Sequence, residues 1–303
     1  MSDLNPMVIG YVGVGAIGAP MARRICESGM RVVVCDKRPE AAEKFSSIAE
    51  VVSSPQEVGD RADIVFSCLP TLESHDEAIT GAGGLVEGKR VRSYVHCGTT
   101  GRTKAIGLEG ALAQRNIAML DAPITGGVAV ASAGNLTVMV SGERALADLA
   151  EPIIKTFARK VVYLGSGVGK AQTMKLVNNM LVGTNLIVPI EALVMGYKAG
   201  LDVGTMMEII NSGPAQNHAT LGKIMKSVLP RTFAHGGALH LIVKDLKAYV
   251  EEAEALEVPA ALGGAVLAAY LRAMEAGRPD DDMTTVILSM ERDAKVTLPS
   301  IVS

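Results

Sequence analysis

Short apolar runs alternate with helical stretches through the first half of this chain, and that alternation constrains its fold more than any other feature. Runs rich in Val, Ile and Leu predict strands at residues 7–12, 31–35, 62–68, 91–96, 118–121, 136–141 and 161–163. The segments between them predict helices at residues 19–28, 40–45, 74–79, 103–115 and 143–157. Such alternation is typical of a parallel sheet with helices on both faces. We therefore expect a doubly wound α/β domain.

After the glycine-rich residues 165–169 the pattern changes to helices alone. The periodicity predicts them at residues 169–199, 203–212, 221–227, 239–256, 260–276 and 283–295. A chain of 303 residues is long enough for two domains. We expect residues 1–164 to form the α/β domain and residues 165–303 to form an all-α domain, with the long first helix joining them.

The composition limits the partners and ligands that this chain is expected to have. The net charge is −3, and Lys and Arg form no long cluster, which argues against nucleic acid and anionic membrane surfaces. The four cysteines stand singly, so we expect neither a zinc site nor a disulfide framework. No carboxylate accompanies His218, His235 and His240 at a spacing typical of metal ligands, so we expect no metal. The cysteine usage fits a reducing compartment, which predicts a cytoplasmic protein.

One segment, residues 176–195, is apolar enough to raise the question of a membrane span. Polar or helix-breaking residues interrupt it at Asn178, Asn179, Asn185, Pro189 and Glu191, and a bilayer would oppose that load by several kcal/mol. The first six residues include an acid and no basic region, unlike a signal peptide. We expect a soluble protein with a buried helix here.

Gly13, Gly15 and Gly18 follow the first predicted strand, with Ala16 and Ile17 before the last of them. In this G-x-G-x-x-G spacing the first glycine permits a tight turn, the second lets a pyrophosphate approach the backbone, and the third allows close packing of helix on strand. The helix N-terminus supplies N–H donors to the phosphates. Asp36 closes the second predicted strand, about 20 residues further on, where an acid binds the ribose hydroxyls. The pattern predicts a dinucleotide site.

The residues at the end of the second strand also bear on the choice of cofactor. Asp36 favours NAD, because the 2′-phosphate of NADP would meet its negative charge. Lys37 and Arg38 follow directly and offer a cationic site for that phosphate, which keeps NADP as the alternative.

Four sequence motifs stand in an order that resembles one family. They are GVGAIGAPMA at residues 13–22, DAPITGG at 121–127 (continuing to Ala131, Gly134 and Leu136), GSGVGKAQTMKLVNNM at 165–180, and KDL at 244–246. In this order they resemble the β-hydroxyacid dehydrogenases, which include 3-hydroxyisobutyrate dehydrogenases and tartronate semialdehyde reductases. The resemblance implies a Rossmann domain followed by a helical domain. It also implies hydride transfer between a nicotinamide cofactor and a 3-hydroxy acid.

The same resemblance implies roles for individual residues. Lys175 would be the general acid/base, with Asn179 beside it. Thr125, Gly126 and Gly127 would hold the substrate carboxylate, and Lys244 would contact cofactor and substrate, with Asp245 either fixing Lys244 or capping locally. The remaining positions would border the cofactor: Leu69, Pro70 and Thr99.

The pair Lys175 and Asn179 also makes chemical sense without the family. Four residues apart on a helix, they share one face. Oxidising an alcohol requires removal of the hydroxyl proton, and a lysine can accept it if burial lowers its pKa from about 10.4 toward neutrality.

Two loops depart from the family pattern. Residues 96–102 read HCGTTGR where D-x-S-T is usual, which leaves only Thr99 of that motif and puts cofactor contacts there in question. We expect His96 to be structural.

The stretch before Lys244 usually carries P-G-F, whereas this chain has His235-Gly236-Gly237. Glycine in place of a large aromatic predicts a roomier pocket and a substrate other than 3-hydroxyisobutyrate.

Other functions remain open at this point. Imine or ketimine reduction on the same scaffold is an alternative, although such proteins usually lack a lysine at position 175. A non-catalytic dinucleotide sensor is another, and the presence of Lys175, Asn179 and Lys244 argues against it. The helical domain is rich in Ala, Leu, Val and Met, which predicts a homodimer or homotetramer that buries them.

Overall fold

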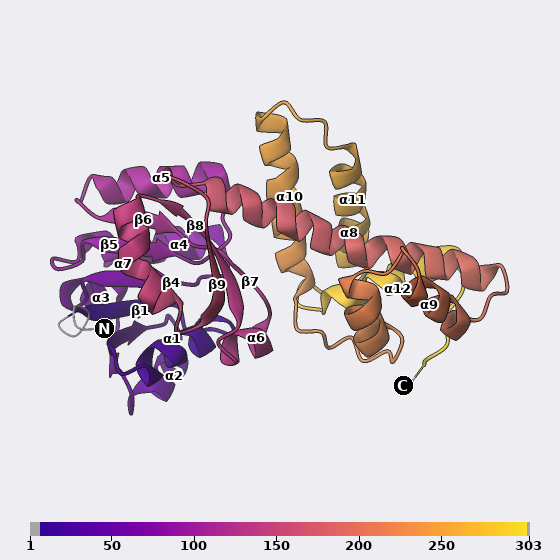
Figure 1. Cartoon of the computed structure of the whole chain (residues 1–303), viewed down its shortest axis with the longest axis horizontal. Coiled ribbons are helices and arrows are strands. Elements are labelled where there is room, and N and C mark those ends of the chain that lie inside the picture. The colour runs from indigo at the N-terminus through magenta and orange to yellow at the C-terminus, as the bar shows by residue number, and fades with distance from the viewer. Residues whose placement is uncertain (1–6, 302–303) are drawn as a thin grey trace. The chain divides into compact units, whose positions relative to one another are not determined.

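The computed structural model describes residues 7–301 and divides into two compact units, with the division between Lys175 and Leu176 (Figure 1). That division lies inside the long helix α8 (Lys170–Lys198). The boundary predicted from the sequence, after residue 164, lies upstream of it. The first unit is an α/β structure and the second is helical, as the change of pattern in the sequence predicts.

A nine-stranded sheet forms the centre of the first unit. In chain order its strands are β1 (Val8–Val12), β2 (Arg31–Cys35), β3 (Glu50–Val51), β4 (Ile64–Ser67), β5 (Ser93–His96), β6 (Ala118–Asp121), β7 (Ile124–Thr125), β8 (Leu136–Gly142) and β9 (Ala158–Tyr163). Their order across the sheet is β3-β2-β1-β4-β5-β6-β8-β7, with β9 paired to β8. The six strands from β3 to β6 are parallel, so their carboxyl ends share one edge.

Beyond β6 the sheet is mixed, whereas the alternation of strands and helices predicts parallel pairing. β8 runs antiparallel to both β6 and β7. The reason lies in the connection: β6 leads through two residues into β7 without a crossover helix, and the chain then turns back through the short α6 (Val128–Ser132). Since parallel neighbours need a long crossover, the returning strand pairs in the opposite direction.

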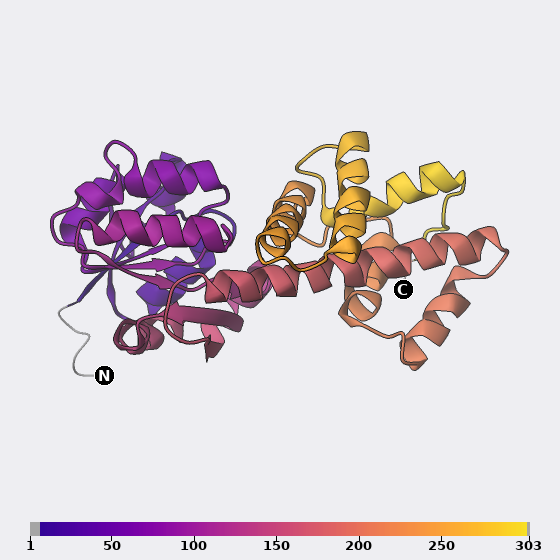
Figure 2. The same cartoon turned by 90° about the horizontal axis from the view of Figure 1, so that it is seen from above.

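Helices cover both faces of the sheet (Figure 2). They are α1 (Gly18–Glu27), α2 (Pro39–Ala42), α3 (Pro55–Arg61), α4 (Leu72–Thr80), α5 (Arg102–Ala113) and α7 (Arg144–Ile154), with 3₁₀ turns η1 (Glu43–Phe45) and η2 (Leu85–Glu87). Strand β1 shows the two-sided burial: Ile9 and Tyr11 belong to one apolar cluster, and Val8 and Val12 to the other. A strand buried on both faces is therefore apolar throughout.

The second unit packs helices around its own core. They are the distal part of α8, α9 (Val203–Ser212), η3 (Ala219–Val228), α10 (Leu239–Ala255), α11 (Ala261–Ala276), the 3₁₀ turn η4 (Met283–Thr285) and α12 (Val286–Ala294). By length and composition α8 is able to cross a membrane, yet Leu186, Ile190 and Leu193 lie buried in this core. η3 is a π-helix rather than the α-helix that its periodicity suggests.

Candidate functional site

The glycine-rich segment after β1 has the geometry of a dinucleotide-binding loop. Gly13 has φ +91°, a left-handed value that strains other residues, and a Cβ there would lie 2.6 Å from Cδ2 of Leu69. A Cβ on Gly18 would lie 2.0 Å from the carbonyl oxygen of Gly13, so only glycine lets α1 begin this close to the strand. Leu69, which follows β4, thus packs directly on the loop.

No side chain caps the N-terminus of α1. Its N-cap residue is Ile17, and the first turn carries no acid. Gly15 has open space beside it, with a guanidinium nitrogen of Arg38 3.6 Å from where its Cβ would be. A bare helix N-terminus beside a glycine fits the pyrophosphate of a dinucleotide. Ala16 lies exposed on the same loop.

Asp36, just after β2, reaches back to this loop. Its Oδ2 accepts a hydrogen bond from the backbone N–H of Val14 at 2.8 Å, and its Oδ1 accepts from the N–H of Arg38 at 2.9 Å. The Arg38 guanidinium lies 3.3 Å from the same Oδ1, while Lys37 pairs with Glu77. The Asp36 carboxylate is therefore held against the loop, and both neighbouring basic residues, Lys37 and Arg38, form ion pairs with carboxylates.

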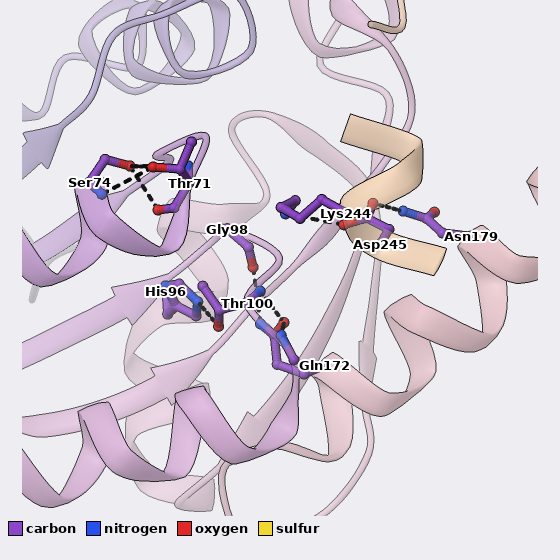
Figure 3. A network of polar contacts seen from close by, with 10 residues as sticks. Thr71, Ser74, His96, Gly98, Thr100, Gln172, Asn179, Lys244 and Asp245 are labelled. Carbon is purple, nitrogen blue, oxygen red and sulfur yellow. Dashed lines mark hydrogen bonds and ion pairs between the residues drawn. The ribbon is translucent and has the colours of Figure 1, made fainter. Parts of the chain in front are cut away.

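Pro70 and Thr99 follow the carboxyl ends of β4 and β5, where parallel sheets bind ligands. Pro70 is exposed and Thr99 is half-buried. Thr71, next to Pro70, caps α4: its Oγ1 accepts from the N–H of Ser74 at 3.1 Å (Figure 3). The cap fixes the loop that carries Leu69 and Pro70.

A buried network anchors the first turn of α8 to the sheet. Oδ1 of Asp121 accepts from Nε2 of Gln172 at 2.7 Å, and Oδ2 accepts from the Gln172 N–H at 3.1 Å. The same Nε2 donates to the carbonyl of Gly98 at 3.0 Å. Oε1 accepts from the N–H groups of Thr100 at 2.9 Å and Gly101 at 3.1 Å (Figure 3). Both polar atoms of the Gln172 side chain therefore form hydrogen bonds.

Burial also sets the proton affinity of Asp121. Desolvation raises the pKa of its carboxyl to about 6, and hydrogen bonds from Gln172, Gly169 and Ser141 oppose that rise. These donors are arranged around a carboxylate, so the ionised form is held despite the loss of water.

His96 ends β5 inside this interior, as expected of a structural residue. Its Nε2 lies 3.0 Å from Oγ1 of Thr100, and its ring centroid is 4.5 Å from that of His75 on α4. Both rings are buried. A Cβ on Gly98 would lie 2.5 Å from Nε2 of His75. The ring of His75 therefore occupies the space that a side chain at position 98 would take. This explains the glycine in a loop that departs from the family's D-x-S-T pattern.

Thr125, Gly126 and Gly127 form the turn from β7 into α6. Thr125 is half-buried, and both glycines are exposed. Gly126 has φ +135°, and Gly127 has no heavy atom within 4 Å of where its Cβ would be. Backbone N–H groups exposed at such a turn can approach a carboxylate closely.

Lys175 is half-buried on α8, three residues after the anchored Gln172. One turn further on, Nδ2 of Asn179 donates to Oδ2 of Asp245 on α10 (Figure 3). The other oxygen of Asp245 pairs with Nζ of Lys244 at 3.1 Å. Asp245 thus joins Asn179 and Lys244, which the sequence predicts as site residues, and it fixes Lys244 as expected.

The sequence patterns suggest no role for Asp121 or Gln172, and they present Arg38 only as a cation for the phosphate of NADP. Both network residues stand inside recognised motifs, but their partners are distant in sequence, and no spacing rule connects them. The one available signal was Asp121 itself, an acid directly after three apolar residues of a buried strand.

Comparison with known families agrees with this geometry. Residues 8–165 match the model of the NAD binding domain of 6-phosphogluconate dehydrogenase. Residues 169–290 match the model described as NAD-binding of NADP-dependent 3-hydroxyisobutyrate dehydrogenase. Together the two models cover both units of the structure.

Individual relatives align over nearly the whole chain. It is similar to the L-threonate dehydrogenase of Cupriavidus necator, with 30% identity over 283 residues, 92% of this chain and 94% of the relative. It is also similar to the 2-(hydroxymethyl)glutarate dehydrogenase of Eubacterium barkeri, with 30% identity over 294 residues, 96% of this chain and 97% of the relative.

A solved structure of Mycobacterium tuberculosis 3-hydroxyisobutyrate dehydrogenase with L-serine superimposes with a TM-score of 0.84 and 27% identity, covering 94% of this chain and 99% of that one. The family predicted from the four motifs is confirmed by both models and by these full-length relatives. The chain belongs to the β-hydroxyacid dehydrogenase family.

Proposed function

We propose that this protein interconverts a 3-hydroxy acid and its 3-oxo form, with Lys175 as the general acid/base. The observation that carries the proposal is the group formed by Asn179, Asp245 and Lys244, with Asn179 one helical turn beyond Lys175. Two relatives support the substrate class, since their names give 2-(hydroxymethyl)glutarate and 3-hydroxyisobutyrate, which each carry one hydroxyl at the 3-position. A third relative is named for L-threonate, which carries a 3-hydroxyl beside two others.

Each side chain has a defined task in this reaction. The nicotinamide, when bound, exchanges the hydride with the alcohol carbon. During oxidation Nζ of Lys175 accepts the hydroxyl proton, and during reduction it returns that proton to the oxygen. Asn179 orients the hydroxyl, because Asp245 fixes its amide. The anchored first turn of α8 holds Lys175 in place.

A different set of groups binds the carboxylate of the substrate. The N–H groups of Gly126 and Gly127 and the hydroxyl of Thr125 are suited to a carboxylate. Lys244, held by Asp245, contributes a positive charge. Gly237 stands where the family usually carries a phenylalanine, which favours a substrate larger than 3-hydroxyisobutyrate.

For the cofactor we propose NAD as the preferred form. The Asp36 carboxylate, with 8% of its side chain exposed, stays fixed at the glycine loop, and it places a negative charge where a 2′-phosphate would bind. Arg38 and Lys37 both pair with carboxylates, which lowers their availability to that phosphate.

We also propose a homodimer or homotetramer, in the cytoplasm. Leu181, Val188 and Met195 are exposed and recur every seven residues along one face of α8. An apolar stripe of this length is typical of a surface that a second copy covers.

The experiment that tests the function follows nicotinamide absorbance with a panel of 3-hydroxy acids, from serine and glycerate to bulkier members, using NAD and NADP. We expect turnover with one acid and a loss of about 10²- to 10⁴-fold in kcat for Lys175→Ala. The matched control is Lys170→Ala, an exposed lysine on the same helix. Equal losses in both variants, or no turnover of any acid, would overturn the proposal.

A further inference from the structure

A buried lysine in the helical unit lacks the partner that a buried charge normally has. Lys223, on η3, is 6% exposed. The one hydrogen bond of its Nζ within residues 7–301 goes to Sδ of Met283 at 3.6 Å, and no carboxylate forms an ion pair with it there. A thioether is a weak acceptor, whereas an ammonium has three donors. Buried charges are almost always paired, so this one requires an explanation.

The neighbouring acid is already engaged. Oδ2 of Asp282 accepts from the N–H of Gly236 at 2.7 Å, and Oδ1 accepts from the N–H of Thr284 at 3.0 Å and from its Oγ1 at 2.6 Å. The Asp282 charge raises the pKa of Lys223, but the larger effect is burial, which lowers it. Asp282 therefore holds a loop and caps η4, and it leaves the ammonium only partly compensated.

Two imidazoles lie near the same group. His235 is exposed on the loop that follows η3, and its pKa is lowered by burial first and then by the charge of Lys223. His218, exposed at the N-cap of η3, also acts on His235. One acid, Asp282, thus acts on both Lys223 and His235, and His218 adds a third basic group beside His235. That balance suits an anion.

A side chain at position 237 would crowd the sulfur that Lys223 contacts. Around the position of a Cβ on Gly237, the only heavy atoms within 4 Å belong to Met283, and the nearest is Sδ at 3.3 Å. This is the same sulfur that contacts Lys223. η3 is a π-helix, closed by a bond from the N–H of Leu229 to the carbonyl of Ile224 at 2.9 Å, and such wide turns often accompany functional sites.

We propose that Lys223, with His235 and His218 at its rim, binds a carboxylate, and that this is the distal carboxylate of a dicarboxylic 3-hydroxy acid. The source of the carboxylate rests on the function proposed above. The loop of residues 235–237 leads directly into α10, whose second turn carries Lys244. Lys244 engages one end of the ligand, and Lys223 engages the other.

The test uses two substrates that differ only at the distal group, 2-(hydroxymethyl)glutarate and 2-(hydroxymethyl)pentanoate, in which a methyl group replaces the second carboxylate. The variant Lys223→Met removes the charge and keeps the length of the side chain. Its control is Lys226→Met, one turn further along η3 and exposed. We expect the preference in kcat/KM for the diacid to fall by about 10- to 100-fold in Lys223→Met alone.

A second arm measures calorimetric binding of glutarate, which has no hydroxyl group to oxidise, and so works without turnover. Loss of glutarate binding in Lys223→Met with an unchanged diacid preference would overturn the substrate assignment and support a site for a free acid. The same loss with no turnover of either substrate would support the carboxylate site while the proposed function fails. Unchanged preference and unchanged glutarate binding would overturn the whole inference. If Lys223→Met does not fold, Lys223→Gln replaces it.

Discussion

Gln172 and Asp121 are joined twice, by the side-chain Nε2 to Oδ1 at 2.7 Å and by the backbone N–H to Oδ2 at 3.1 Å. The pair connects the first turn of α8 with the end of β6, residues that are far apart in the sequence. Lys175 lies three residues after Gln172, so the position of the proposed acid/base depends on a buried amide that does not touch the substrate.

Replacing that amide should damage both stability and catalysis. Gln172→Leu removes four side-chain hydrogen bonds and leaves Oδ1 of Asp121 buried with fewer donors. We expect the free energy of unfolding in urea to fall by about 2–4 kcal/mol. Gln114→Leu, at an exposed position, serves as the control. Equal unfolding midpoints and slopes for the two variants would show that the network contributes little.

The raised pKa of Asp121 predicts a specific pH dependence. The folded protein binds a proton with a pKa of about 6, whereas the unfolded chain binds it near the ordinary value of 3.8. The stability that this group contributes is therefore fully present below pH about 4 and is lost as the pH rises through about 6. Linkage gives a change of about 3 kcal/mol at most.

The measurement compares the free energy of unfolding of wild type and Asp121→Asn from pH 4 to pH 7, since the variant has no proton to bind at that position. We expect the difference between the two proteins to change by up to about 3 kcal/mol across this range. Parallel curves would mean that Asp121 titrates at its ordinary pKa in the folded state.

The carboxylate at the end of β2 should set the choice of cofactor. Asp36→Asn removes the negative charge and frees Arg38 from its ion pair, so a 2′-phosphate becomes acceptable. We expect the ratio of kcat/KM for NAD to that for NADP to fall by about 10-fold or more. Glu40→Gln, which removes an exposed acid nearby, should leave the ratio unchanged. A ratio that shifts equally in both variants would point to general electrostatics instead.

The apolar stripe on α8 predicts where subunits meet. Val188→Glu places a charge in the middle of that stripe, between Leu181 and Met195. Light scattering should then report a monomer at micromolar concentration, whereas we expect the wild type to be a dimer or larger. Ile48→Glu, an exposed apolar position in the first unit, is the matched control. A wild-type monomer would refute the assembly directly.

Much of the fold follows from local patterns. The ranges of β2, β6 and α9 agree with the sequence prediction at both ends, because each is a continuous periodic run with clear boundaries. The elements that the prediction lacks are short: β3 and β7 have two residues each, η2 has three and α6 has five. The seven-residue α3 begins with a proline and contains a glycine. Such segments are stabilised by their neighbours rather than by their own periodicity.

The cofactor loop was predictable because glycine spacing reports directly on backbone geometry, as the positive φ of Gly13 shows. The connection between Asn179, Asp245 and Lys244 was only partly predictable. Adjacent residues suggested that Asp245 fixes Lys244, but the bond to Asn179 joins α8 and α10. The group around Lys223 could not be found from the sequence, since its meaning depends on burial and on a single contact with Met283.

The contact between Gly98 and His75 limits which substitutions each position can accept. A side chain at position 98 would lie 2.5 Å from Nε2 of His75, so a serine there requires either a shift of the imidazole or a smaller residue at position 75. Conversely, shrinking His75 alone leaves a void beneath the loop that contains Thr99. The two positions form an epistatic pair. We therefore expect the effects of the two substitutions on stability to be non-additive, with each costing more alone than beside the other.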